Sequence, residues 1–179
     1  MKHQKMEAAA VRDHSWNKDH TKDIQRISVR ALVEFILREG DIDNRTGGMP
    51  DLEAMRLGSR IHRRIQAGMG EDYQAEVPLS MDFPCDDFLI RVEGRADGIV
   101  AETDQETALV DEIKGILRPV QLLNEPVGVH LAQARCYAFM YAAQHKLENI
   151  RVRISYVSLQ TADSSLSVIR KQMRFFTFA

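Results

Sequence analysis

The sequence predicts an α/β domain built around one mixed β-sheet. Its 179 residues, of which 44% are hydrophobic and 28% charged, are enough for a single hydrophobic core. Apolar residues recur with helical spacing in some segments and fill short strand-like runs in others, in the order helix–helix–three strands–helix–two strands. This order is typical of helices packed against a single sheet.

Two helices are expected first. Ser28 is a suitable N-cap for a helix over 29–39, and Gly40 is a natural C-terminal stop. The apolar stripe of this helix consists of Val29, Leu32, Val33 and Ile36. A turn-rich loop over 41–50 leads to a second helix over 51–67. Its inward-facing residues are expected to be Leu52, Met55, Ile61 and Ile65.

Three strands are expected next. The stretch 76–79 predicts the first of them. The segments 88–102 and 107–117 are rich in Ile, Val, Leu and Phe and flank a polar cluster over 103–106, so they predict a hairpin.

The last part of the chain predicts one helix and two strands. A linker with two prolines precedes a helix over 129–145. The residues expected on one side of this helix are Ala132, Cys136, Met140 and Ala143. Strands over 152–159 and 172–178 then follow, joined by a turn-prone segment over 161–165.

Composition narrows the function classes. The formal net charge of −2 gives no overall basic field for a nucleic-acid partner, and local arginine clusters are more often solvated faces. Two cysteines are too few for a disulfide framework or a four-cysteine metal cluster, and no apolar segment indicates export or membrane insertion. We therefore expect a cytoplasmic protein, with a polar, flexible leader over 1–24 and a folded domain over 25–179.

The predicted hairpin brings three ionisable side chains to one face. A turn centred between Asp104 and Gln105 pairs residues whose numbers sum to 209, so Asp97 faces Glu112. Lys114 lies two residues beyond Glu112 and shares its face. Two carboxylates and one ammonium at this spacing indicate a divalent-metal site beside a lysine that positions a nucleophile.

A solvated hairpin face with ordinary cross-strand ion pairs is the alternative interpretation. A shift of the register by one residue would move Asp97 or Glu112 to the other face. The carboxylates, however, are embedded in apolar strands. Three neighbouring strand positions carry no side chain, because they are Gly94, Gly98 and Gly115. Glycine in a strand often marks close approach by a ligand or another backbone, which favours a functional site.

Other polar residues could join the hairpin. His62 borders the apolar stripe of the second helix and is either a hydrogen-bonding residue at the core edge or a metal ligand. Gln133 and Tyr137 share one face of the later helix. They are either a solvent-facing glutamine beside a packed tyrosine or a pair that reaches the substrate or holds the lysine. Glu76 is either a surface charge, which we favour, or a residue that supports the ligands.

Four separated motifs, in this order, resemble the RecB branch of the PD-(D/E)xK nuclease superfamily. They are Gly58-x-x-x-His62, Gly94-Arg95-Ala96-Asp97, Asp111-Glu112-Ile113-Lys114 and Gln133-x-x-x-Tyr137. The resemblance covers about residues 27–178. Within this branch, the stretches 27–30, 40–43 and 129–134 are similar to the nuclease domain that precedes DinG-like DNA helicases.

The resemblance implies a restriction-endonuclease-like core, with a central mixed sheet flanked by helices, and a nuclease domain over 25–179. It implies that Asp97 and Glu112 bind Mg²⁺ or Mn²⁺. The imidazole of His62 and the backbone carbonyl of Ile113 would be further ligands. Many relatives carry four cysteines for an iron–sulfur cluster; this chain has two, so no such cluster is expected.

The resemblance also implies roles for the remaining polar residues. Lys114 would act with the two carboxylates in catalysis by orienting or activating the attacking water. Gln133 and Tyr137 would contact the scissile region or brace Lys114.

We therefore expect a Mg²⁺- or Mn²⁺-dependent deoxyribonuclease, of the exonuclease type, that acts on single-stranded DNA or a duplex end. It would be the nuclease module of a helicase-nuclease or DNA-repair system, with a helicase on the same or another chain. The alternative is a nuclease-fold module that binds DNA or docks a helicase without cutting.

Overall fold

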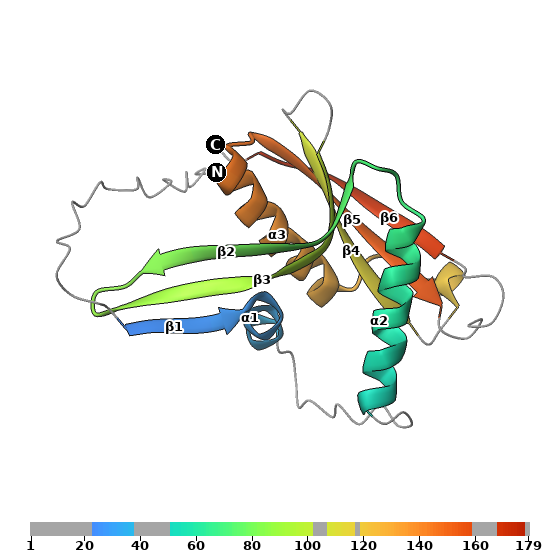
Figure 1. Cartoon of the computed structure of the whole chain (residues 1–179), viewed down its shortest axis with the longest axis horizontal. Helices are drawn as coiled ribbons and strands as arrows, with labels where there is room; N and C mark the ends of the chain where they lie inside the picture. The colour runs from blue at the N-terminus through green and yellow to red at the C-terminus, as the bar shows by residue number, and fades with distance from the viewer. Residues whose placement is uncertain (1–22, 38–50, 102–106, 117–118, 159–167, 178–179) are drawn as a thin grey trace, which may run out of the picture.

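The computed structural model describes residues 23–37, 51–101, 107–116, 119–158 and 168–177 (Figure 1). In these residues one six-stranded mixed sheet is formed by β1 (Asp23–Ser28), β2 (Tyr73–Pro84), β3 (Phe88–Ala101), β4 (Ala108–Ile116), β5 (Asn149–Ser158) and β6 (Val168–Thr177). The helices are α1 (Val29–Ile36), α2 (Asp51–Ala67), α3 (Gly128–His145) and a short 3-10 helix, η1 (Val120–Leu122). The predicted α/β class, with one mixed sheet flanked by helices, is confirmed.

The sheet is assembled on β3. β2 pairs antiparallel with β3 along one edge, from Tyr73↔Val100 to Pro84↔Leu89. The other edge is shared, because β1 pairs parallel with the first part of β3 and β4 pairs antiparallel with its end. Residues 94–97 of β3 lie in the gap between these two partners. From β4 the sheet continues through a parallel β5 and an antiparallel β6.

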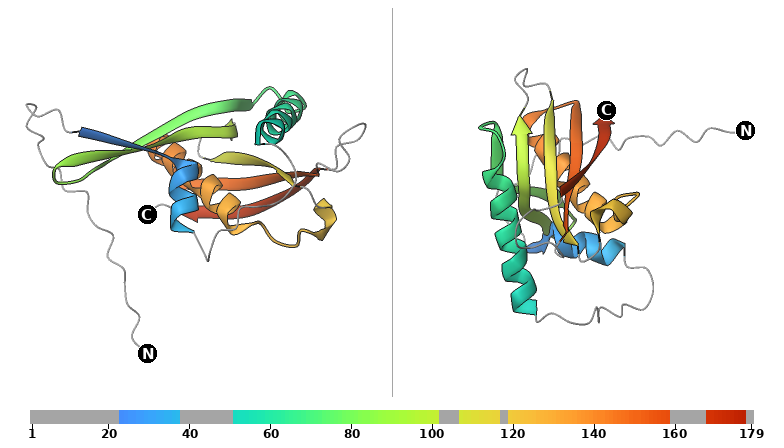
Figure 2. Two further views of the ribbon diagram at one scale, coloured as in Figure 1. Left: turned by 90° about the horizontal axis from the view of Figure 1, so that it is seen from below. Right: turned by 90° about the vertical axis from the view of Figure 1, so that its right-hand side faces the viewer.

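Helices cover both faces of the sheet (Figure 2). α1 and α3 pack on one face, over a large core that includes Val110, Ile154 and Tyr156. α2 lies on the opposite face, where a small cluster consists of Ile61, Ile65, Ile113 and Val157. Alternation along each strand sends successive side chains to these two cores. None of the described helices combines the length and apolar composition needed to span a membrane.

Both predicted N-terminal helices are present, although α1 ends at Ile36 and not at the expected residue 39. The Ser28 side chain accepts a hydrogen bond from the backbone N–H of Ala31 at 3.1 Å, as expected of an N-cap. In the predicted apolar stripe, Val29 and Val33 are buried and Leu32 is half-buried. The last residue of the stripe, Ile36, is 65% exposed. α2 has the predicted bounds and buries Ile61 and Ile65. Gly40 and the side chains of Leu52 and Met55 lie outside the described part of the chain.

α3 begins one residue before its expected start. Of the four residues expected on one side of it, Met140 is buried, Ala132 and Cys136 are half-buried and Ala143 is exposed. The buried residues are Ala134, Tyr137, Ala138, Met140, Tyr141 and Ala142. α3 carries apolar residues on most of its circumference, so periodicity does not single out one face. The face that α3 buries is set by its packing against α1 and the sheet.

The sheet is larger than its sequence pattern indicates. β1 has no counterpart among the predicted strands, because its side chains are exposed apart from the half-buried Ile27 and it forms through backbone pairing with β3. Asp23 and Ile24, expected in the leader, therefore belong to the sheet. β2 extends well beyond the predicted 76–79; as an edge strand it tolerates two prolines. The segments 41–50, 103–106 and 161–165 lie outside the described residues.

A buried polar network joins β4 to β5. Asp111 is fully buried, and its two carboxylate oxygens accept hydrogen bonds from Ser155 Oγ and from Arg153 Nη2, each at 2.7 Å. The Tyr73 hydroxyl donates to the same carboxylate at 3.4 Å. Burial, together with the charge of Asp111, raises the pKa of Tyr73. Asp111 thus links three strands.

Replacing Asp111 by alanine should lower the free energy of unfolding by about 3–5 kcal/mol, because the partly buried Arg153 loses its counter-ion. Urea unfolding measures this difference. Asp82→Ala is the matched control, since it removes an exposed aspartate paired with Arg91 at 2.6 Å and should change stability little. Equal losses in the two variants would contradict a special role for the buried network.

Candidate metal centre

The site lies where β3 and β4 separate. Their register, from Gly98↔Asp111 to Ala101↔Ala108, has the predicted sum of 209. The ladder ends at Gly98↔Asp111, so Asp97 and Glu112 lie one step beyond the last pair. There Asp97 Oδ2 accepts a hydrogen bond from the backbone N–H of Ile113 at 2.7 Å. The carboxylate thus takes the place of a strand carbonyl and holds the two strands at their point of separation.

His62 comes to the same carboxylate from α2. Its Nδ1 lies 3.3 Å from Asp97 Oδ1. The hydrogen bond to Asp97 raises the pKa of His62 above its ordinary value, although burial acts in the opposite direction. His62 therefore faces the hairpin, while its neighbour Ile61 is buried against Ile113. The side chain of Ile113 belongs to that core, so its backbone is the part that can face the site.

Glu112 is the most buried acid of the predicted site, with 1% of the residue exposed. Its Oε1 lies 2.7 Å from Lys114 Nζ, whereas Oε2 has no hydrogen-bond partner among the described residues. Burial is the main cause that raises the pKa of Glu112 to about 7, and the charge of Asp97 adds to it. Lys114 acts in the opposite direction. A buried carboxylate oxygen without a donor is the kind of group that a cation would satisfy.

Lys114 is held from two sides. Besides Glu112, its Nζ lies 3.1 Å from Gln133 Oε1 on α3. Tyr137, one helical turn further on, is 4% exposed and hydrogen-bonded to the Gln133 side chain and the Arg95 backbone. The structure therefore brings Gln133 to Lys114 and Tyr137 to Gln133. The contact of Gln133 with Lys114 agrees with the interpretation in which this pair holds the lysine, whereas the burial of Tyr137 agrees with the alternative of a packed tyrosine.

Two of the glycines singled out in the sequence make room for tyrosine rings. A Cβ atom at Gly94 would lie 2.6 Å from the Tyr137 hydroxyl oxygen. A Cβ atom at Gly98 would overlap the ring of Tyr73. The expected close approach is real, but it is made by aromatic side chains rather than by a ligand or another backbone.

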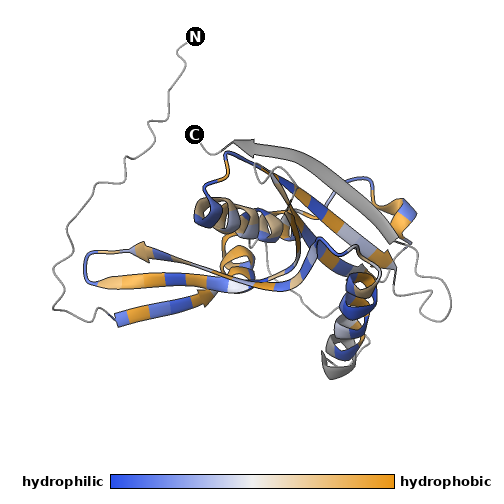
Figure 3. Ribbon diagram, turned by 45° about the horizontal axis from the view of Figure 1, so that its top comes forward, coloured by the Kyte–Doolittle hydropathy of each residue, from blue (hydrophilic) through white to orange (hydrophobic). Residues whose placement is uncertain are grey.

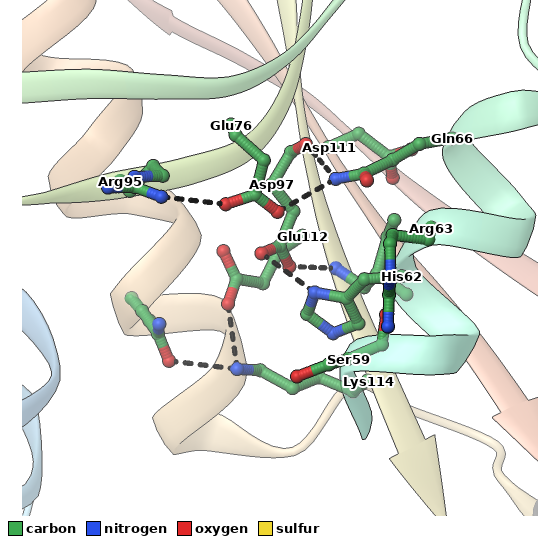
Figure 4. Close-up of polar contacts among 12 residues, drawn as sticks. Ser59, His62, Arg63, Gln66, Glu76, Arg95, Asp97, Asp111, Glu112 and Lys114 are labelled. Atoms are coloured by element: carbon green, nitrogen blue, oxygen red, sulfur yellow. Dashed lines mark hydrogen bonds and ion pairs between the residues drawn. The ribbon is translucent and has the colours of Figure 1, made fainter. Parts of the chain in front are cut away.

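The site also contains two residues, Glu76 and Gln66, that the spacing of the motifs does not single out. Glu76 of β2, favoured as a surface charge, offers a carboxylate oxygen that lies within 4.8 Å of ligand atoms from both His62 and Asp97. Gln66 Nε2 donates to Asp97 O at 2.9 Å and to Glu76 Oε1 at 3.0 Å (Figure 4). Gln66 lies one helical turn after His62, which is the signal that could have found it. Glu76 shows no such signal, because its position depends on the β2–β3 register.

The donor set fits a divalent cation. Carboxylate and carbonyl oxygens suit Mg²⁺, and an added imidazole makes Mn²⁺ and other transition ions competitive. His62 offers a nitrogen, and Asp97 and Glu76 offer oxygens, within 4.8 Å of one another. Glu112, one step beyond the last β3–β4 pair, is a further candidate oxygen ligand. The structure also supports this fit, because Oε2 of Glu112 is buried without a hydrogen-bond partner among the described residues and a bound cation would satisfy it.

Comparison with known proteins supports the fold. No family model and no curated protein matches the chain. Eleven chains of solved structures match it, among them the crystal structure of SSO0001, which is 18% identical. That similarity has a TM-score of 0.56 and covers 87% of this chain and 70% of the other. At this identity the likeness concerns the fold alone, and the predicted restriction-endonuclease-like α/β core agrees with it.

Glu112→Gln should stabilise the metal-free protein at pH 8. The pKa of Glu112 is about 7 in the folded state against 4.5 ordinarily, so ionisation opposes folding. This cost is absent well below pH 4.5, grows as the pH rises from 4.5 to 7 and is complete above 7; the gain at pH 8 is up to about 3 kcal/mol. Urea unfolding in EDTA at pH 8 and pH 4.5 measures it. A variant less stable than the wild type at pH 8 would contradict the argument.

Proposed function

We propose that this chain is a metal-dependent DNA nuclease of the RecB branch of the PD-(D/E)xK superfamily. The observation that carries the proposal is the convergence of Asp97, Glu112 and Lys114 with His62 where β3 and β4 separate. These side chains come from the two strands of the β3–β4 hairpin and from α2, which precedes the hairpin in the sequence. The arrangement combines acidic ligands for a metal ion with a fixed ammonium group, and both kinds of positive charge can stabilise the charge that develops during phosphodiester hydrolysis.

Each ligand has a defined position in this proposal. Asp97, Glu112, His62 and the backbone carbonyl of Ile113 would hold Mg²⁺ or Mn²⁺. The bound ion would neutralise charge on the phosphate and lower the pKa of a water molecule. The hydrogen bond from the Ile113 N–H fixes the Asp97 carboxylate before any ion arrives.

Lys114 would place a positive charge beside the attacked phosphate. Its ammonium is 2.7 Å from Glu112 Oε1 and 3.1 Å from Gln133 Oε1, and its side chain is 23% exposed. It is therefore fixed by two oxygens but still accessible. In this position it can orient the attacking water and offset the charge that develops on the phosphate.

DNA affinity would come from local arginines, because the net charge of the chain is −2. α2, the helix that carries His62, also carries the exposed Arg60, Arg63 and Arg64. The described residues of α2 are largely hydrophilic outside its buried isoleucines, as the colouring of its ribbon shows (Figure 3). Contacts of this kind neutralise phosphates without reading sequence, and they weaken as salt is added.

Incubation with single-stranded and duplex DNA tests the proposal. We expect cleavage in Mn²⁺ or Mg²⁺ and none in EDTA, since the proposed ion is required for the chemistry. Asp97→Asn should be inactive in all conditions because it removes a ligand oxygen charge. Absence of cleavage at any protein concentration, with DNA still bound, would favour a non-cleaving module that grips DNA or docks a helicase.

Lys114→Ala should reduce the cleavage rate by about 100- to 1000-fold while Mn²⁺ and DNA binding stay near the wild-type values, because the lysine is not a ligand. Cleavage rates and Mn²⁺ titrations measure the two effects. Lys146→Asn is the matched control: it removes an exposed ammonium at a left-handed position that asparagine tolerates. Unchanged cleavage in Lys114→Ala would count against the assigned role.

A further inference from the structure

Glu76 and Asp97 lie across from each other on neighbouring strands. Their flanking pairs are Ala75↔Gly98 and Val77↔Ala96. One ligand atom each from His62, Glu76 and Asp97 all lie within 4.8 Å of one another. Ligand atoms on opposite sides of an ion such as Mg²⁺ are about 4.2 Å apart, so small side-chain movements would close this set around one ion.

The local structure directs the Glu76 carboxylate to this position. Glu76 has a φ of 55°, which no residue but Lys146 shares among the described non-glycine residues, and the β2–β3 ladder skips it. Gln66 Nε2 binds the Asp97 carbonyl at 2.9 Å and holds Glu76 Oε1 at 3.0 Å. Glu76 is thus turned out of the regular strand and tied to the residues of the candidate centre.

A second observation points to a cation at the same place. Oε2 of Glu112 is buried and has no hydrogen-bond partner among the described residues. It is turned toward Asp97 and Glu76 (Figure 4).

We infer that Glu76 is a further ligand of the divalent cation proposed to bind His62, Asp97 and Glu112. The inference rests on the proposed metal site and adds a residue to it. Glu76 Oε2 lies 3.6 Å from Arg95 Nη1 in an exposed ion pair. Arg95 therefore competes with the cation for Glu76. A third carboxylate makes the donor set richer in oxygen, which favours Mg²⁺ and Mn²⁺.

Mn²⁺ titration of the full chain by calorimetry tests this role. Glu76→Gln keeps an oxygen for Gln66 to bind but removes the charge, and it should weaken Mn²⁺ binding at least about tenfold. Glu93→Gln is the matched control, because Glu93 also pairs with an arginine, Arg26, at 2.8 Å, outside the cluster. Its Mn²⁺ affinity should equal that of the wild type. Wild-type affinity in Glu76→Gln, or equal losses in both variants, would overturn the inference.

Arg95→Gln provides a test that does not depend on losing a ligand. Removal of the competing guanidinium should tighten Mn²⁺ binding severalfold in the wild-type background. This gain in Mn²⁺ affinity should disappear when Glu76→Gln is also present, because Arg95 weakens Mn²⁺ binding by pairing with the Glu76 carboxylate. An equal gain in both backgrounds would overturn the inference, since Arg95 would then act through its own charge alone.

The two proposals fail separately. Mn²⁺ binding that requires Glu76, without DNA cleavage, would overturn the nuclease proposal and support the ligand assignment. DNA cleavage that requires Asp97, with Mn²⁺ binding indifferent to Glu76, would do the reverse. A wild-type chain that binds no Mn²⁺ would overturn the ligand assignment, and the cleavage assay would decide the nuclease proposal.

Discussion

The candidate site depends on one hydrogen bond, between the backbone N–H of Ile113 and Asp97 Oδ2 at 2.7 Å. It lies just beyond the last β3–β4 pair, where regular strand pairing stops. A separation of two strands inside a sheet would normally leave a buried N–H without an acceptor. The Asp97 carboxylate supplies that acceptor, in a bond to a charged group that contributes about 1.5–3 kcal/mol. The hydrogen bond that satisfies this N–H therefore also fixes the Asp97 carboxylate, whose Oδ1 lies 3.3 Å from His62 Nδ1.

The opening of the sheet also explains why a helix can reach these acids. Residues 94–97 lie between β1 and β4 on their edge of β3, and α3 packs there with Tyr137 over Gly94. On the other face, α2 is anchored by Ile61 and Ile65. That anchoring turns His62 and Gln66, one turn apart, toward the separated strands. Core packing and site geometry are thus set by the same helix.

Two adjacent acidic residues on β4 have different roles: Asp111 stabilises the fold, and Glu112 belongs to the candidate site. Asp111 points to one face and is fully paired with Arg153 and Ser155. Glu112 points to the other face, where one oxygen pairs with Lys114 and the other has no partner among the described residues. Burial without full compensation opposes ionisation, so this carboxylate is costly for the folded state. Such costs are typical of functional sites, and the neighbouring Asp111 network supplies the stability.

The sequence by itself determined the features that local spacing encodes. The apolar runs on either side of the 103–106 turn fixed the register that brings Asp97 to Glu112, and the period of two placed Lys114 on the same face. Ser28 and the bounds of α2 followed from cap chemistry and helical periodicity. The tertiary structure decided that β1 joins the sheet, which face α3 buries and that Glu76 faces Asp97. These depend on contacts between distant segments: β1 is held by backbone bonds that carry no side-chain pattern, α3 is apolar on most sides, and Glu76 is positioned by pairing that its own neighbours do not specify.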